Sequence, residues 1–123
     1  MVLVRIVVGA FLVAHGLVHL LYLADLPEFS IDRSWLLPPA MRRPVGLLLT
    51  TATITAFVIL GSGPWGVLGP SGMWPGLMAV AAVLSGALLI LFWNRWLIVG
   101  LAIDVGLLAV AVIRPEWAER LMS

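Results

Sequence analysis

The sequence contains four long apolar segments, at residues 2–24, 44–62, 75–93 and 96–113. A helix needs about 20 apolar residues to cross the hydrocarbon core of a bilayer, and each of the four segments is close to that length. Together they occupy most of the 123 residues, so that no second domain fits. We therefore predict an all-α integral membrane protein with one domain over residues 1–123, a four-transmembrane-helix antiparallel bundle with an interfacial first loop.

The composition excludes most soluble functions. Hydrophobic residues make up 63% of the chain and charged residues 11%, whereas a soluble domain has about 45–50% apolar and about 25% charged residues. A soluble domain of this size could not shield so much apolar surface from water, which excludes a soluble enzyme, a disordered tail and a nucleic-acid-binding domain. The absence of cysteine excludes disulfides, thiolate metal sites and a cysteine nucleophile.

Tryptophan and proline mark the ends of the apolar segments. All six tryptophans lie in the predicted loops or at segment ends, as expected for aromatic side chains at a membrane interface: Trp35, Trp65, Trp74, Trp93, Trp96 and Trp117. Pro44 and Pro75 are expected in the first turns of the second and third helices, where the missing N–H is harmless. The first segment lacks an A-x-A cleavage site and carries two histidines, so we expect a retained helix rather than a signal peptide.

The connections between the segments differ in length and composition. Residues 25–43 mix charged and aromatic side chains with three prolines, which is typical of a segment on the membrane surface, and we expect it to form a lid. Residues 94–95 predict a tight turn, and residues 114–123 predict a short surface helix. The arginines divide almost evenly between the two sides of the membrane, so the positive-inside rule hardly discriminates; the uncharged second loop favours an outside position for that loop.

Four ionisable residues lie inside the predicted spans, where such residues are costly and usually functional: Arg5, His15, His19 and Asp104. Because successive residues of a helix are rotated by about 100°, all strongly polar residues of the first span share one face. The members of this face are Arg5, Val8, Gly9, Leu12, His15, Gly16, His19 and Tyr22. We expect the face to point into the bundle, where its glycines allow close approach of a helix or a ligand.

His15 and Asp104 lie at nearly the same depth, close to the middle of the first and fourth spans, so we predict a contact between their side chains. The pair can act as a structural link between helices or as a site for proton transfer. Hydrogen bonds between membrane helices contribute about 0.6 kcal/mol on average, which is small compared with the cost of burying an acid, and this favours a site. We predict His15 and Asp104 as catalytic residues. The predicted ligand-binding residues are His19, Tyr22, Arg5 and Gly16, although Arg5 is also close enough to the surface to extend its charge into the headgroups.

Other chemistries have weaker support. His15 and His19 have the i,i+4 spacing of zinc-binding helices, but the glutamate of that motif is missing and only Asp104 remains as a deep third ligand. A haem held by two histidines needs ligands from two helices, which here only a dimer would supply. We therefore predict no metal site and leave the cofactor open. The chain lacks a G-x-S-x-G elbow and has too few polar residues to line a channel. The threonines of the second span are expected to bond back to the helix backbone: Thr50, Thr51, Thr53 and Thr55. Thr51 and Thr55 share a face, so the alternative for these two is to line a pocket.

The first helix, with Arg5, Gly9 and the adjacent pair His15 and Gly16, resembles that of the DoxX-like group of small four-helix membrane proteins. Residues 32–37 (DRSWLL) and Asp104 are similar to those of small bacterial membrane proteins. The resemblance implies a four-helix bundle in the bacterial cytoplasmic membrane and, for DoxX itself, a link to quinone-coupled sulfur oxidation. The long first loop and the second histidine depart from that family, so no substrate is carried over.

Two functions of different class follow from these patterns. The first is an intramembrane site for a lipophilic small molecule, such as a quinone or an isoprenoid, at which His15 and Asp104 transfer protons or support redox chemistry. The second is a non-catalytic accessory subunit of a larger membrane complex, or a homo-oligomer, in which small residues mediate helix contacts. Pairs of this kind are Ala10 and Ala14, Ala82 and Gly86, and Ala102 and Gly106. An open cavity touching His15 and Asp104 would favour the first function, and a filled interior with a flat outer face of small residues would favour the second.

Overall fold

The computed structural model describes residues 2–23, 31, 34–65, 71–93 and 97–122, and within them all regular secondary structure is helical. In chain order the elements are α1 (Val2–Leu17), the 3₁₀-helix η1 (Val18–Leu23), α2 (Pro39–Ser62), the 3₁₀-helix η2 (Ser71–Met73), α3 (Trp74–Leu91), α4 (Ile98–Ile113) and α5 (Glu116–Met122). The predicted all-helical class is confirmed for this part of the chain.

Three continuous helical segments are long and apolar enough to cross a membrane: Val2–Leu23, which joins α1 and η1, Pro39–Ser62 and Trp74–Leu91. The shorter α4 passes the same test only together with α5, and the two helices are bent by 100° relative to each other. The described residues therefore hold three candidate membrane spans, or four if α4 and α5 count as one bent span. Helices of this length and composition are those of a membrane-integral protein.

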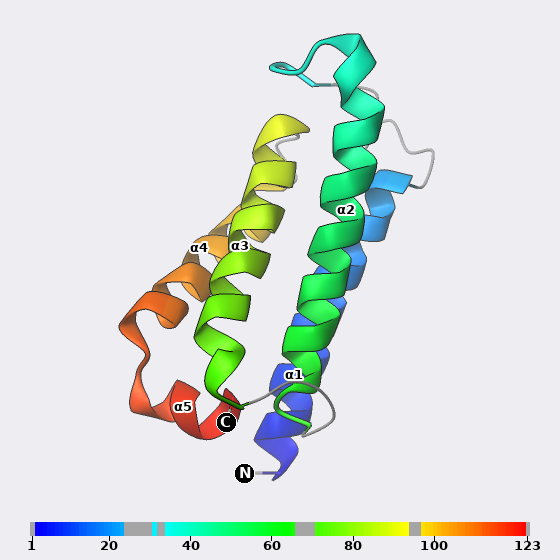
Figure 1. Ribbon diagram of the computed structural model, residues 1–123. Helices are drawn as coiled ribbons and strands as arrows, with labels where there is room; N and C mark the ends of the chain where they lie inside the picture. Colours follow the sequence, from blue (N-terminus) through cyan, green and yellow to red (C-terminus); the bar gives the residue numbers. More distant parts are fainter. Residues whose placement is uncertain (1, 24–30, 32–33, 66–70, 94–96, 123) are drawn as a thin grey trace.

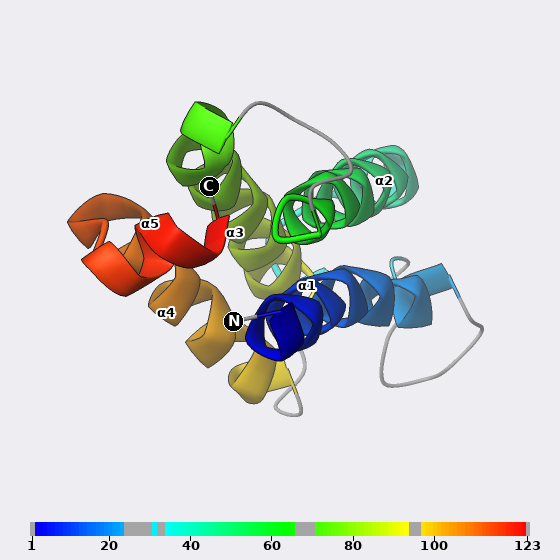
Figure 2. The same ribbon diagram turned by 90° about the horizontal axis from the view of Figure 1, so that it is seen from below.

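The four longest helices run side by side and alternate in direction along the chain (Figure 1). α2 packs against both α1 and α3, and α3 packs against α4. Seen along the helices, α1 and α4 flank the remaining side, where they do not form a closely packed pair like the other neighbours (Figure 2). We call this side the α1–α4 seam, and it is here that the candidate site lies.

The predicted inward face of the first span is confirmed by burial. The buried residues of α1 and η1 are Gly9, Leu12, His15, Gly16, His19 and Tyr22. Large apolar side chains between them, such as Val7, Phe11 and Leu20, are exposed. An apolar outer surface around a partly polar interior is the arrangement that a lipid environment favours, because lipid cannot satisfy polar side chains.

α2 begins at Pro39, earlier than the predicted start at Pro44, which instead lies inside the helix. Pro38 is the extended N-cap residue, and Pro39 occupies the first turn, where proline is favourable. Pro44 therefore lies more than one turn inside the helix. The N–H that Pro44 lacks would have bonded to the carbonyl of Ala40, which lies in the exposed first turn. The prediction for the start of this helix is therefore wrong. Pro39 and Pro44 could each mark the first turn of a helix, and Pro39 is the one that does so.

Part of the predicted lid packs on the end of α3. Residues 24–30 and 32–33 lie outside the described residues, as does the predicted turn at 94–95. Of the remainder, Ile31 is buried in an apolar cluster with Tyr22 and Phe92. Ser34 Oγ donates a hydrogen bond to the carbonyl of Leu91 at 2.6 Å, and the indole of Trp35 donates to that of Ile90 at 2.6 Å. These bonds satisfy carbonyls that the last turn of a helix leaves without internal partners.

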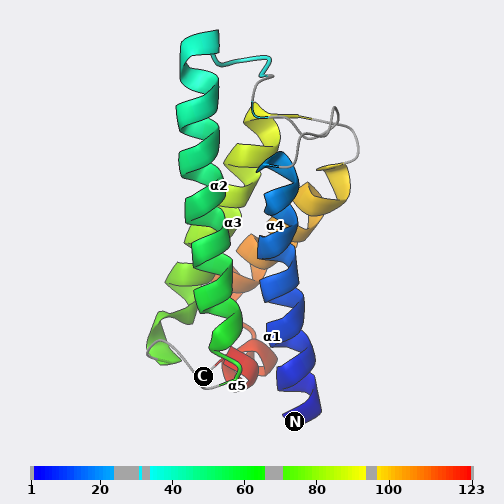
Figure 3. The same cartoon turned by 90° about the vertical axis from the view of Figure 1, so that its right-hand side faces the viewer.

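The predicted helix in the C-terminal tail is present as α5, which lies across the same end of the molecule as the start of α1 (Figure 3). α4 ends at Ile113, and the left-handed conformation of the next residue, Arg114 (φ 53°, ψ 57°), turns the chain away from the helix axis. Glu119 of α5 accepts hydrogen bonds from Arg114 Nε at 2.8 Å and from the indole of Trp74 at 3.2 Å. α5 is thereby tied to α3 and to the end of α4.

These two donors make the attachment of α5 dependent on pH. Hydrogen bonds from Trp74 and from Arg114 hold the pKa of Glu119 below its ordinary value. A carboxyl with a lowered folded-state pKa stabilises the fold above its ordinary pKa, and this stabilisation is lost as the pH falls through the folded-state pKa. We expect amide protection of α5 against hydrogen exchange to be higher in the wild type than in Glu119→Gln at neutral pH. The difference should vanish in acid, and a difference that persists unchanged in acid would contradict this assignment.

Candidate functional site

The predicted contact between the first and fourth spans is present in the structure. His15 Nε2 on α1 lies 2.8 Å from Asp104 Oδ1 on α4, and both side chains are buried. Asp104 and Ala111 are the only buried residues of α4, so this hydrogen bond is the main polar link across the α1–α4 seam among the described residues. Because His15 also packs edge-on against Phe57 of α2, at 4.9 Å between ring centroids, its ring orientation is fixed from two sides.

Two further side chains extend the pair into a chain of four. Ser85 on α3 lies 2.5 Å from the second carboxyl oxygen of Asp104, Oδ2. The same hydroxyl lies 2.8 Å from Nε2 of His19 on η1. The order of contacts is therefore His15, Asp104, Ser85, His19, and it joins α1, α4, α3 and η1 at the centre of the molecule. All four side chains are buried.

Ser85 was not among the predicted site residues. A signal for it exists, because Ser85 carries the only side-chain hydroxyl between Trp74 and Leu91, in a helix that is otherwise apolar. A hydroxyl in that setting needs a partner. The sequence does not say which partner it finds, since α3 has apolar residues on every side.

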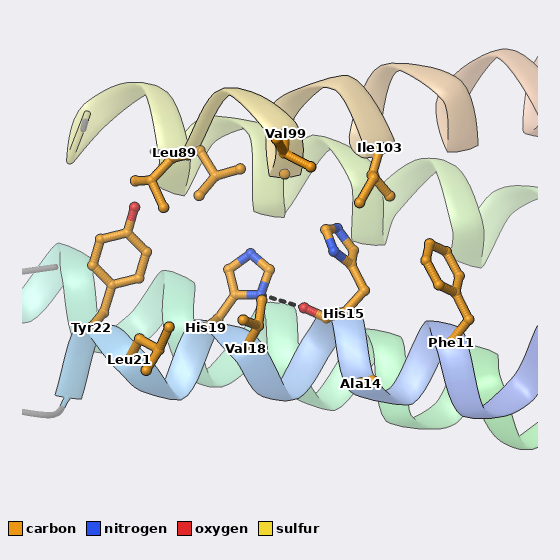
Figure 4. Close-up of a pocket in the computed structure, with 12 residues that line it drawn as sticks. Phe11, Ala14, His15, Val18, His19, Leu21, Tyr22, Leu89, Val99 and Ile103 are labelled. Carbon is orange, nitrogen blue, oxygen red and sulfur yellow. Dashed lines mark hydrogen bonds between the residues drawn. The ribbon is translucent and has the colours of Figure 1, made fainter. Parts of the chain in front are cut away.

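The change from α-helix to 3₁₀-helix after Leu17 accompanies an unusual contact of His19. His19 Nδ1 lies 3.0 Å from the carbonyl oxygen of His15 (Figure 4). It also lies 3.1 Å from the carbonyl oxygen of Gly16. Carbonyl oxygens only accept hydrogen bonds, so Nδ1 of His19 must carry a proton. With Nε2 on Ser85, both nitrogens of His19 are engaged by the protein.

A cavity with a volume of about 350 Å³ lies in the α1–α4 seam, beside these residues. Figure 4 shows Phe11, His15, His19 and Tyr22 projecting in a row from α1 and η1 toward Leu89, Val99 and Ile103. The other lining residues are Ala14, Val18, Leu21, Leu97 and Gly100. Phe11, Val18 and Val99 are exposed, so the cavity opens sideways, toward the surface that lipid would cover. Its wall is apolar except for the two imidazoles and the phenol.

The imidazole of His15 lines this cavity. Its Nε2 contacts Asp104, and within the described residues no hydrogen bond to its Nδ1 is found. Asp104 itself does not line the cavity and lies behind the imidazole. A molecule in the cavity would therefore meet His15 directly and Asp104 only through His15.

The other predicted ligand-binding residues divide into two groups. His19 and Tyr22 line the cavity, and the Tyr22 hydroxyl donates to the carbonyl of Phe92 at 3.2 Å. Arg5 lies at the opposite end, where its guanidinium donates to the carbonyl of Arg120. Gly16 packs directly against Phe57 of α2. The structure thus brings His19 and Tyr22 to the cavity but not Arg5 or Gly16.

The threonines of α2 lie away from the cavity. Thr55 bonds back to the carbonyl of Thr51 at 2.8 Å, as predicted, and both side chains are exposed and outside the cavity lining. Thr50 and Thr53 are fully buried, and their hydroxyls have no hydrogen-bond partner among the described residues. The predicted bond back to the helix is therefore wrong for these two threonines.

Comparison with known proteins leaves the site to be judged on its geometry. No family model matches the chain, and no curated protein or solved structure is significantly similar to it. The resemblance to the DoxX-like group therefore stays a prediction. Within the described residues, no group of three histidine, aspartate or glutamate side chains is placed to hold a metal ion.

Proposed function

We propose that this chain is a four-span protein of the bacterial cytoplasmic membrane that binds a lipophilic small molecule in the α1–α4 seam. The observation that carries the proposal is the cavity, which is apolar, opens sideways and exposes a buried imidazole backed by a carboxyl group. In this arrangement α4 is the fourth span and α5 lies on the membrane surface. Lipid surrounds the outer face, and the ligand enters from the hydrocarbon region rather than from water.

The cavity size fits the headgroup of a quinone or a short isoprenoid. Ligand sites commonly have volumes of about 300–1,000 Å³ and apolar walls with a few polar groups. At about 350 Å³, the cavity holds a substituted ring, while an isoprenoid tail extends through the opening beside Phe11, Val18 and Val99. Tyr22 and His19 form the polar end of the cavity.

The chemistry of this site is proton transfer at His15 Nδ1. When Asp104 accepts a hydrogen bond from Nε2–H, it fixes the tautomer of His15, and Nδ1 then carries the lone pair that is left for a ligand. Such a nitrogen can remove a proton from a hydroxyl group, and the protonated ring can return it to a carbonyl oxygen. Asp104 stabilises the imidazolium form, and the apolar wall excludes water from the exchange.

This function is tested by the ligand content of the purified protein. Native mass spectrometry and an absorption spectrum of the detergent-purified wild type should show a retained small molecule. His15→Ala and Asp104→Asn should lose it while the helical circular dichroism spectrum is kept, because the first variant removes the base and the second removes the carboxyl group that stabilises its protonated form. Thr51→Ala, on the exposed outer face of α2, is the matched control and should retain the ligand. Full ligand content in both site variants would contradict the proposal.

The alternative function is a non-catalytic accessory subunit, which the outer face of α4 favours. Ala102, Gly106 and Ala109 are all exposed on this helix, and nothing lies within 4 Å of the place where Gly106 would carry a Cβ. Small residues on an open face allow another membrane helix to approach closely. The same mass spectra decide between the two functions, since a ligand-free oligomer or a co-purifying protein would identify a subunit and make His15 and Asp104 a structural link.

A further inference from the structure

The chain of contacts from Asp104 to His19 contains two hydrogen bonds that need two protons. One bond joins Asp104 Oδ2 to Ser85 Oγ, and the other joins Ser85 Oγ to His19 Nε2. The hydroxyl of Ser85 supplies one proton. His19 Nδ1–H points to the carbonyls of His15 and Gly16, so that proton cannot serve either bond. The second proton must therefore be carried by Asp104 Oδ2 or by His19 Nε2.

Two arrangements satisfy both bonds. In the first, Asp104 is protonated and donates from Oδ2 to Ser85, which donates to Nε2 of a neutral His19. In the second, His19 is an imidazolium that donates from Nε2–H to Ser85, which donates to an ionised Asp104. The two arrangements have the same atoms and the same net charge of zero over the three residues. They differ only in the side of Ser85 on which the second proton lies.

Neutrality over these three residues is what a membrane interior favours. A buried carboxylate without a positively charged partner is costly in a low-dielectric medium. When His15 is neutral, an ionised Asp104 beside a neutral His19 would be such a carboxylate, and the bond between Ser85 and His19 or that between Ser85 and Asp104 would lack a proton. We propose that Asp104, Ser85 and His19 hold one shared proton, and that Ser85 relays it between the carboxyl group and the imidazole. Ser85 is in this respect a positioning residue that acts through Asp104.

The relay lets His15 pass on the proton that it takes from a ligand, so that the charge comes to lie on His19. This step rests on the proposed function. Starting from the first arrangement, a ligand X–H loses its proton and a bond to His15 Nδ1 forms. The Nε2–H bond of His15 breaks as a bond to Asp104 Oδ1 forms, and the Oδ2–H bond breaks as its proton passes to Ser85 Oγ. The original hydroxyl proton of Ser85 passes to His19 Nε2. The positive charge therefore lies on His19 rather than on His15, and the reverse sequence returns a proton to the ligand.

The protonation states can be read from the protein without any ligand. The chain has only two histidines, so ¹⁵N-histidine labelling of the full-length protein in lipid bilayers gives two imidazole spectra, assigned with His15→Gln. Infrared spectra of ¹³C-aspartate-labelled protein report the protonation of Asp104, and Asp25→Asn/Asp32→Asn leaves Asp104 as the only labelled residue. At neutral pH we expect a neutral His19 with a protonated Asp104, or a protonated His19 with an ionised Asp104, or an exchanging mixture of these two. The proposal would be overturned by a neutral His19 with an ionised Asp104. It would also be overturned by a protonated His19 together with a protonated Asp104.

Variants separate a relay from a merely structural hydroxyl. Asp104→Asn offers an amide N–H to Ser85, which should force Ser85 to donate to His19 and remove any imidazolium signal of His19. Ser85→Ala should change the ¹⁵N signal of His19 Nε2 and leave the signal of Nδ1 in place. Ser85→Thr keeps the hydroxyl and should restore the wild-type Nε2 signal. Ser62→Ala is the matched control, because Ser62 is buried and its hydroxyl, within the described part of the chain, bonds to the carbonyl of Ile59 and to neither histidine. This variant should leave both imidazole spectra unchanged.

These measurements are independent of ligand retention. If the purified protein carries no ligand but the shared proton is found, the relay stands and the proposed ligand does not. If ligand is retained through His15 but His19 is neutral beside an ionised Asp104, the ligand site stands and the relay is wrong. An unchanged His19 Nε2 signal in Ser85→Ala would also contradict the relay.

Discussion

Replacing Gly61 with leucine is expected to lower the free energy of unfolding by about 3 kcal/mol, the upper part of the range for overpacked interiors. A Cβ at Gly61 would lie 2.8 Å from the carbonyl oxygen of Gly9 and 3.0 Å from the backbone nitrogen of Val13. These are backbone atoms of α1, so no rotamer change relieves the contact and α1 must move away from α2. The measurement is unfolding of the detergent-solubilised protein by sodium dodecyl sulfate, followed by circular dichroism.

The matched control is the same substitution on an open helix face. Gly106 on α4 is exposed, and nothing lies within 4 Å of the position that a Cβ would take there. Glycine is about 0.8–1.0 kcal/mol less favourable than alanine inside a helix, and leucine ranks close to alanine, so Gly106→Leu should leave the stability unchanged or slightly raised. If the two variants unfold at the same denaturant concentration, the result would contradict the close backbone contact between α1 and α2 at Gly61. The comparison also tests the site, because α1 and η1 carry the two histidines.

Asp104→Ala is the second substitution with a large expected effect. It removes the acceptor of His15 Nε2 and the partner of Ser85, and it leaves both groups buried. Breaking a buried charged pair costs about 3–5 kcal/mol in soluble proteins, whereas single hydrogen bonds between membrane helices average about 0.6 kcal/mol. Because two bonds are lost and two partners are stranded, we expect a destabilisation of about 2 kcal/mol. Asp104→Asn should lower the free energy of unfolding by less, because the amide keeps the contacts with His15 and Ser85.

A surface acid provides the comparison for Asp104. Glu116 pairs with Arg120 at 3.6 Å on α5, and both side chains are largely exposed. Exposed pairs of this kind contribute little because water screens them, so Glu116→Ala should leave the unfolding midpoint unchanged. Equal midpoints for Asp104→Ala and the wild type would show that the α1–α4 seam is held by apolar packing alone.

Much of the site follows from the periodicity of one segment. The rotation of about 100° per residue places His15, His19 and Tyr22 on one face of the first span, and the structure buries all three. The depth of His15 and Asp104 in their spans also predicts their contact, because antiparallel helices of similar length bring their midpoints together. Arg5 shares the same face but lies near the opposite end, so a common face does not make a common site.

The position of Ser85 could not be predicted in the same way. α3 is apolar around its whole circumference, and a helix without a polar face gives no indication of which residues turn inward. The start of α2 was also wrongly predicted, since Pro39 and Pro44 offer the same local signal. In both cases the deciding interactions are with other helices or with the chain that precedes the helix.

Length, hydropathy and helical rotation, all properties of the local sequence, determined the membrane-spanning character of this protein and the inward face of its first helix. They act within one helix, where the geometry is fixed by backbone hydrogen bonds. The tertiary structure alone decided that α1 and α4 stay apart, that a cavity forms between them, and that Ser85 joins Asp104 to His19. These features depend on the distance and rotation between helices, which side-chain packing over the whole molecule sets.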